Sequence, residues 1–174
     1  MRKTILFALM CLATLSTKAQ EKKSATTPFF VEATLGAGTP CKKLHPIDAN
    51  FNVGFQITKR FSVQTTLGTG YIIPKDGGVK DYNKFMNLGG GIGYVIHPAN
   101  SKNKDEFAIR ASYTASITSK DYSNNAFSAG LYWYPRHNTR SIEPIVGVGY
   151  NFMNFRKKGI PNYNGAFFSF GIRF

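Results

Sequence analysis

The chain has 174 residues, of which 14% are aromatic and 17 are glycine, and its formal net charge is +13 at pH 7. This length holds one domain with a sizeable core and excludes two domains of usual size. The glycine and aromatic content, with few segments of helical spacing, excludes a protein of long helices and predicts strands joined by turns.

Residues 1–19 have the pattern of a secretory signal peptide. A basic start precedes an apolar run over residues 5–15, and Thr17 and Ala19 supply small residues before a cut at Gln20. The run is too short to span a bilayer as a helix. We therefore expect a mature chain that begins at Gln20 and is exported.

Cleavage would change the charge and the cysteine content of the chain. Losing the three basic residues of positions 1–19 lowers the net charge from +13 to +10. A basic excess suits nucleic acid or an anionic membrane surface, and export favours the membrane over nucleic acid. Cys11 would leave with the signal, so Cys41 has no internal disulfide partner. Pairing of Cys41 between chains stays open, although an idle thiol is favoured.

After a polar lead at residues 20–27, the segment 28–174 contains eight stretches that alternate apolar and polar residues with period two. In chain order they read PFFVEATLGAG, IDANFNVGFQIT, FSVQTTLGTGYI, FMNLGGGIGYVI, FAIRASYTASIT, AFSAGLYWY, IEPIVGVGYNF and AFFSFGIRF. Connections after the odd-numbered stretches are mostly longer than the others. The pattern predicts an all-β fold, an eight-stranded antiparallel up-and-down barrel.

Period two alone does not say whether the apolar face points into a soluble, lipocalin-like barrel or outward into lipid. Several stretches have about ten to twelve residues, which is the length a tilted strand needs to cross a bilayer. The apolar faces carry aromatic residues toward both ends of the strands, as membrane interfaces favour. These residues are Phe29, Phe61, Phe107, Trp133 and Phe174 toward one rim, and Tyr71, Tyr113 and Tyr150 toward the other. The transmembrane barrel is the favoured interpretation.

The eight alternating stretches and the ending GIRF resemble the small outer-membrane β-barrel proteins of Gram-negative bacteria, of the OmpX and OmpA-transmembrane-domain type. In that family the barrel assembly machinery reads a C-terminal aromatic residue with alternating hydrophobic residues before it. The matching positions here are Phe168, Phe170, Ile172 and Phe174. The signal ending in Ala-Gln resembles export signals of Bacteroidota. The resemblance implies an outer-membrane location, with the odd connections facing outward.

The faces opposite the apolar ones carry charged residues that a narrow lumen would have to pair. The candidates for a polar network in the lumen are Glu32, Asp48, Arg110, Glu143 and Arg173. A barrel of about eight strands is just wide enough for side chains, so a structural polar plug is the favoured interpretation. The alternative is a narrow passage for small solutes, helped by inward glycines at positions 89, 91, 93, 147 and 149.

The odd connections are rich in basic residues, and the candidates for an anion-binding surface are Lys42, Lys43, Arg156, Lys157 and Lys158. They could bind the phosphates of lipopolysaccharide, or they could be solvated loops with no partner. Aromatic residues in the same connections favour a contact surface for an extracellular ligand or partner. Those residues are Tyr82, Tyr122, Phe155 and Tyr163.

The sequence offers little for catalysis. The three histidines, His45, His97 and His137, lie in or beside connections, and no phosphate-binding loop, nucleotide motif or metal-ligand spacing is present. We expect no enzymatic activity, no cofactor and no metal. A membrane-embedded lipid hydrolase stays the weaker alternative, and it would need His45 to meet an aspartate at position 76, 81 or 121.

Overall fold

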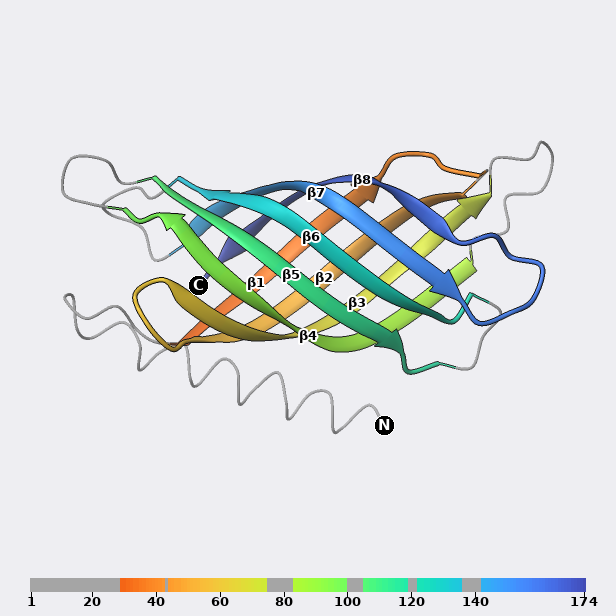
Figure 1. Ribbon diagram of the computed structural model, residues 1–174, viewed down its shortest axis with the longest axis horizontal. Coiled ribbons are helices and arrows are strands. Elements are labelled where there is room, and N and C mark those ends of the chain that lie inside the picture. The colour runs from red at the N-terminus through yellow and green to blue at the C-terminus, as the bar shows by residue number, and fades with distance from the viewer. Residues whose placement is uncertain (1–28, 43, 75–82, 100–104, 119–121, 136–141) are drawn as a thin grey trace.

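The computed structural model describes residues 29–42, 44–74, 83–99, 105–118, 122–135 and 142–174. Eight strands in these ranges form one closed antiparallel barrel, in which each strand pairs with the next and the last pairs with the first (Figure 1). The strands are β1 (Phe29–Gly38), β2 (Leu44–Gln56), β3 (Phe61–Pro74), β4 (Asn83–His97), β5 (Glu106–Ser116), β6 (Asn124–Tyr134), β7 (Glu143–Phe155) and β8 (Tyr163–Arg173). The predicted all-β, up-and-down barrel is confirmed. Among the described residues, no helix has the length and hydropathy needed to cross a bilayer.

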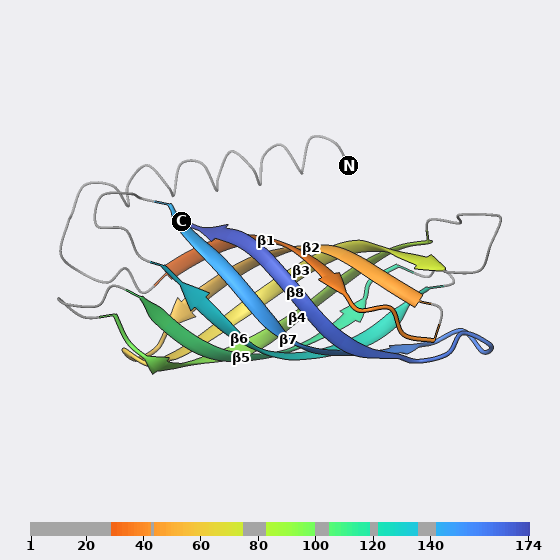
Figure 2. The same cartoon turned by 90° about the horizontal axis from the view of Figure 1, so that it is seen from above.

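The barrel closes along a seam between β1 and β8, where the register runs from Glu32 opposite Arg173 to Gly38 opposite Phe167. Just beyond it, the amide of Phe174 donates to the carbonyl of Val31 at 2.9 Å. Figure 2 shows β8 and β1 side by side along the barrel. Residues 1–28 lie outside the described ranges, so the signal peptide and the polar lead remain predictions.

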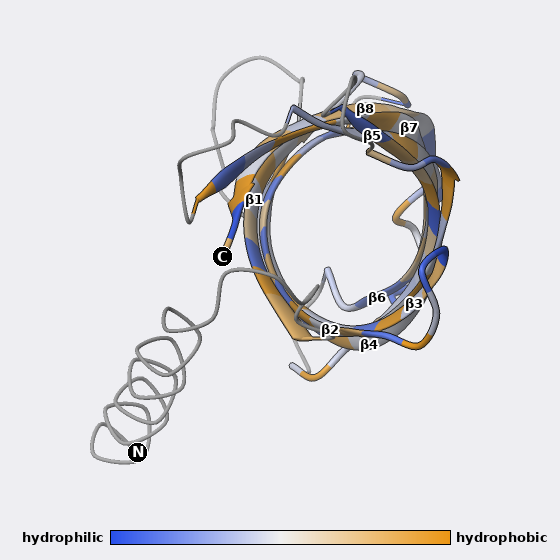
Figure 3. Ribbon diagram, turned by 90° about the vertical axis from the view of Figure 1, so that its left-hand side faces the viewer, coloured by the Kyte–Doolittle hydropathy of each residue, from blue (hydrophilic) through white to orange (hydrophobic). Residues whose placement is uncertain are grey.

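The two faces of the wall have opposite character. Outward side chains are large and apolar, as at Leu35, Ile109 and Phe168, which are more than half exposed. Inward side chains on the same strands are polar and buried, as at Asn52 and Arg110. Figure 3 looks along the barrel and shows apolar and polar segments following one another around the wall. The alternation in the sequence therefore separates outside from inside.

Several strands are longer than the sequence predicts, because their alternation continues into segments that we expected to be connections. β2 begins at Leu44, three residues before the predicted start, and β4 reaches His97. β7 extends to Phe155 and β8 begins at Tyr163. We call the end that holds Phe29 and Phe174 the terminal end, and the opposite end, reached by β7 at Phe155, the loop end.

Candidate functional site

An ion cluster occupies the lumen toward the terminal end. Glu32, on β1, is fully buried and accepts two hydrogen bonds from the Arg110 guanidinium on β5, at 2.6 and 2.8 Å. It also accepts one from Arg173 Nε on β8 at 2.8 Å. Bidentate, charge-assisted bonds of this kind fix the orientation of both partners. A single carboxylate thus joins both strands of the seam to the far wall of the barrel.

Aromatic rings and apolar side chains enclose this cluster. The Arg173 guanidinium lies 4.1 Å from the ring centroid of Tyr134 and 4.6 Å from that of Phe30. Arg110 lies 5.0 Å from the ring centroid of Tyr132. Cation–π contacts stabilise charges that are removed from water. The surrounding buried apolar residues are Val95, Ala108, Tyr134 and Ile145.

The other two predicted lumen carboxylates are placed differently. Glu143 stands directly opposite Arg173 in the β7–β8 register and is half-buried. Asp48 lies farther toward the loop end, where its Oδ1 accepts a hydrogen bond from Asn50 Nδ2 at 2.6 Å. The structure therefore brings Glu32, Arg110 and Arg173 together, keeps Glu143 beside them in register, and leaves Asp48 outside the cluster. Sequence reasoning missed Glu106, whose Oε1 lies 3.8 Å from Arg173 Nη1.

A small polar cavity of about 80 Å³ occupies the middle of the lumen. Its lining includes Asp48, Asn50, Gln64, Thr66, Ser128 and Asn151. A polar cavity of this volume has room for water molecules. Gly147 is one of the glycines that we considered as part of a solute path. The space beside it is occupied by a side chain of the neighbouring strand, because a Cβ at Gly147 would lie 2.6 Å from the Tyr132 ring.

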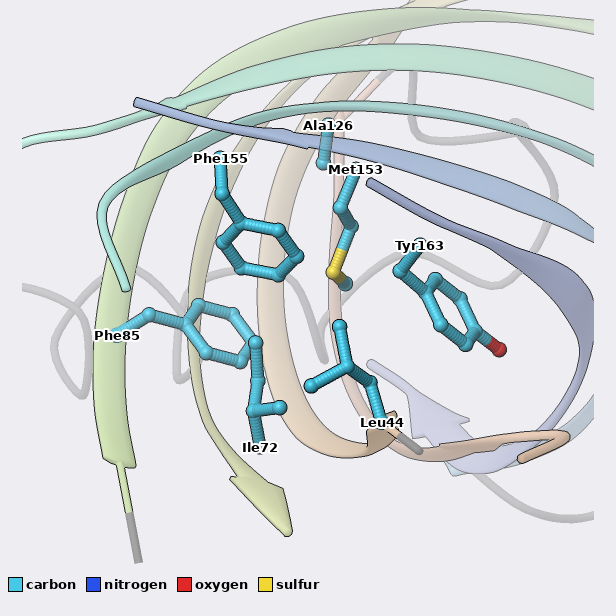
Figure 4. Packing of buried hydrophobic residues seen from close by; sticks show 7 residues of the cluster. All are labelled: Leu44, Ile72, Phe85, Ala126, Met153, Phe155 and Tyr163. Carbon is cyan, nitrogen blue, oxygen red and sulfur yellow. The ribbon is translucent and has the colours of Figure 1, made fainter. Parts of the chain in front are cut away.

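An apolar cluster fills the lumen toward the loop end. Its members come from β2, β3, β4, β6, β7 and β8, and Figure 4 shows their side chains turned toward one another. They are Leu44, Ile72, Phe85, Ala126, Met153, Phe155 and Tyr163. The Tyr163 hydroxyl donates to the carbonyl of Thr39 at 2.9 Å.

The apolar cluster corrects one expectation about the loops. Phe155 and Tyr163 were expected to form a contact surface for a partner, yet they are 6% and 0% exposed, and Tyr122 packs against the same cluster. Tyr82 lies outside the described residues. The reason is strand parity: these positions continue the inner face of strands that extend beyond their expected ends. A signal for the apolar cluster was present in the sequence. Ile72 and Phe85, which belong to the same cluster, are apolar residues on inner-face positions.

A buried polar network ties the loop end of β4 to the hairpin of β5 and β6. Asn87 Nδ2 donates to Asn124 Oδ1 at 2.9 Å, and Ser116 Oγ donates to Asn87 Oδ1 at 2.6 Å. The backbone amide of Asn124 donates to Ser116 Oγ at 2.8 Å. Buried amide groups need such partners, and here the partners come from other strands of the barrel.

The predicted basic residues lie at the loop end, and those that the structure describes are exposed. They are Lys42, Arg156, Lys157 and Lys158, whereas Lys43 lies outside the described residues. Arg156 is held at two points, because its amide donates to the Ser123 carbonyl and its Nη2 donates to Asn125 Oδ1, both at 2.9 Å. In the connection between β1 and β2, Cys41 is a free thiol that donates to Asn164 Oδ1 at 3.1 Å.

The four residues of the predicted assembly signal occupy the outer wall of β8 and the position after it. Phe168, Phe170 and Phe174 are each 54% exposed, and Ile172 is half-buried. The role of these residues in assembly stays a prediction.

The histidines do not form a shared site in the described residues. His45 is in β2 at the loop end, whereas His97 is at the terminal end of β4, with its ring 6.2 Å from that of Phe107. His137 and Asp76, Asp81 and Asp121 lie outside the described residues. Within the ranges described, no group of three or more histidine, cysteine or acidic side chains is arranged to hold a metal ion.

No family model and no curated protein matches this sequence. Among solved structures, it is similar to one described as the solution NMR structure of de novo designed TMB2.3. The TM-score is 0.46 at 12% identity, over 87% of this chain and 97% of that one.

Proposed function

We propose that this protein is an integral outer-membrane β-barrel without enzymatic activity, of the type its sequence resembles. The carrying observation is the polarity of the wall: large apolar side chains cover its outside, while Glu32, Asn52 and Arg110 are buried within it. Water favours the reverse arrangement, and a bilayer favours this one. Aromatic residues at both rims add support, with Trp133 and Phe174 at the terminal end and Tyr113 at the loop end.

Trp133 provides a direct test, because it is the sole tryptophan of the chain and is 38% exposed on the outer wall. The protein would be refolded into vesicles whose lipids carry bromine at different depths. We expect bromine near the headgroups to quench Trp133 fluorescence more than bromine at the bilayer centre. The folded band should also shift on boiling in a detergent gel. A protein that stays soluble without detergent and is not quenched would contradict the proposal.

We propose further that the lumen does not conduct. Support comes from its contents, since the ion cluster fills it toward one end, the apolar cluster fills it toward the other, and the cavity between them is about 80 Å³. Planar-bilayer recording of the refolded protein tests this. We expect no steady ion-conducting steps, and such steps would favour the alternative of a narrow passage for small solutes.

The loops and rim of the loop end are then the part that meets partners. We propose that this surface interacts with lipopolysaccharide, and that cell-surface components or an extracellular ligand are alternatives. Its charge supports an anionic partner. At this end the described outer wall and connections hold Lys42, Lys84, Arg156, Lys157 and Lys158 and no acidic residue. In the sequence, the remaining loop positions add four lysines and three aspartates.

A further inference from the structure

One part of the loop end differs from an ordinary solvated loop, namely the outer wall where β6 meets β7. Arg156 follows β7 directly, and both its amide and its guanidinium are bonded to the first residues of the β6 hairpin at 2.9 Å. The guanidinium uses one of its five N–H groups in the bond to Asn125, and the side chain remains exposed. A cation is therefore held at the rim, with donors left for a ligand.

The residues below Arg156 change character row by row toward the middle of the wall. The first row pairs two amides, Asn125 and Asn154, on neighbouring strands. The second row is aromatic: Phe127 stands opposite Phe152 on one side and opposite Tyr113 on the other. These three side chains are 50%, 41% and 55% exposed.

The third row is small. Ala111 on β5 stands opposite Ala129 on β6, while the flanking position on β7 is Tyr150, which is 53% exposed. The two alanines make this row smaller than the aromatic row beside it. From the rim inward the wall thus presents a cation, amide groups, aromatic rings and small apolar residues.

This order matches the order of groups along a phosphorylated membrane lipid. A phosphate accepts hydrogen bonds from guanidinium and amide N–H groups, aromatic rings favour the interface beneath the headgroup, and an acyl chain packs on apolar surface. Arg156 is followed by Lys157 and Lys158, so three consecutive cations border the site. This charge suits a phosphomonoester, which carries more negative charge than the phosphodiester of an ordinary phospholipid.

We propose that this part of the wall binds a phosphomonoester-bearing glycolipid of the lipid A type, with its phosphate on Arg156, Asn125 and Asn154. The inference rests on the proposed function, because it requires the outer wall to face lipid. It goes beyond that function by naming one site, its residues and the group that they recognise.

Native mass spectrometry of the refolded protein, released from detergent, tests the site by counting bound lipid molecules. The probe is bisphosphorylated lipid A, compared with the same lipid after enzymatic removal of its phosphates. We expect Arg156→Gln to lower the bound fraction of the phosphorylated form by about fivefold, as for the loss of one exposed charge-assisted contact. Binding of the dephosphorylated form should be weak and should not differ between the two proteins.

Arg60→Gln is the matched control, since Arg60 is an exposed arginine at the terminal end whose Nη1 lies 3.5 Å from the Tyr94 hydroxyl. It should bind lipid A as the unchanged protein does. An equal loss in both variants, or no loss in a correctly folded Arg156→Gln protein, would overturn the proposal. Equal, Arg156-dependent binding of phosphatidylglycerol would overturn the choice of a phosphomonoester. Trp133 quenching reports membrane insertion separately, so failure of the site and failure of the barrel assignment are distinguishable.

Discussion

The two ends of the lumen fill the same kind of space with opposite chemistry. Toward the terminal end, one buried carboxylate bonds to both Arg110 and Arg173. Toward the loop end, seven buried apolar side chains pack together and leave their few polar atoms at the edge. An ion cluster is stable only when its charges are paired, whereas an apolar cluster loses stability in proportion to the volume removed. The ends should therefore respond differently to single substitutions.

The largest effect is expected at Glu32. Glu32→Gln keeps the size of the side chain but leaves two buried guanidinium groups without their shared carboxylate. We expect a loss of about 3–5 kcal/mol in the free energy of unfolding, as when one partner of a buried ion pair is removed. Urea unfolding in lipid vesicles, followed by Trp133 fluorescence, measures it.

Asp48→Asn is the control for this change, because Asp48 is a lumen carboxylate that accepts a hydrogen bond from the neutral Asn50. It should cost under about 1 kcal/mol, since no buried arginine depends on it. Equal losses for the two variants would show that any lumen carboxylate has this effect and that the ion cluster is not special.

The next effect tests the apolar end. Met153→Ala removes a side chain that is 3% exposed and should destabilise the barrel by about 3 kcal/mol, through lost burial and the cavity that remains. Met86→Ala on the outer wall of β4 is its counterpart. If the outer wall faces lipid, as proposed, lipid replaces the lost outer contacts, and that change should cost under about 1 kcal/mol. Similar losses would argue that the outer wall is packed against protein or exposed to water.

The smallest effect is expected at the polar edge of the apolar cluster. Tyr163→Phe deletes the hydroxyl that donates to Thr39 and keeps the ring, so we expect a loss of about 1 kcal/mol in the same unfolding measurement. Tyr150→Phe, at an exposed ring of the outer wall, should change stability by less than about 0.5 kcal/mol. A loss at Tyr163 as large as that at Met153 would mean that the hydroxyl, and not the apolar packing, holds this end together.

The sequence predicts the barrel and the inward positions of Glu32, Arg110 and Arg173 because a strand has only two faces. A slip of one residue would send each of these charges to the apolar outside, so alternation alone assigns them. Which inward charges meet is a different question. Glu32 and Arg110 are 78 residues apart and lie on strands that are not neighbours, so their contact depends on the stagger and closure of the whole barrel.

The positions of the strand ends are the second feature that the sequence does not predict. Phe155 and Tyr163 stand beside residues that suit a loop, namely the basic run 156–158 and the proline at 161. Their burial follows from parity with the inner-face residues of β7 and β8. An apolar residue on an inner-face position was the available signal. This signal has to be weighed against neighbouring residues that favour a turn. Local composition does not say whether such a position belongs to the strand or to the connection.

The seam between β1 and β8 gives the ion cluster a role in the order of folding. Glu32 and Arg173 face each other across the ladder that joins the first and last strands, and Arg110 reaches the same carboxylate from β5. Before closure, Arg110 has its partner Glu32 on one edge of an open sheet, whereas Arg173, on the other edge, has Glu143 opposite it on β7 but not Glu32. Only the closed barrel brings Glu32 to both arginines, so the contact between Glu32 and Arg173 forms only when the circle of strands is complete. A chain that closes in a shifted register would separate Glu32 from Arg173. The free-energy cost of a buried charge without its partner would therefore disfavour such misassembled barrels.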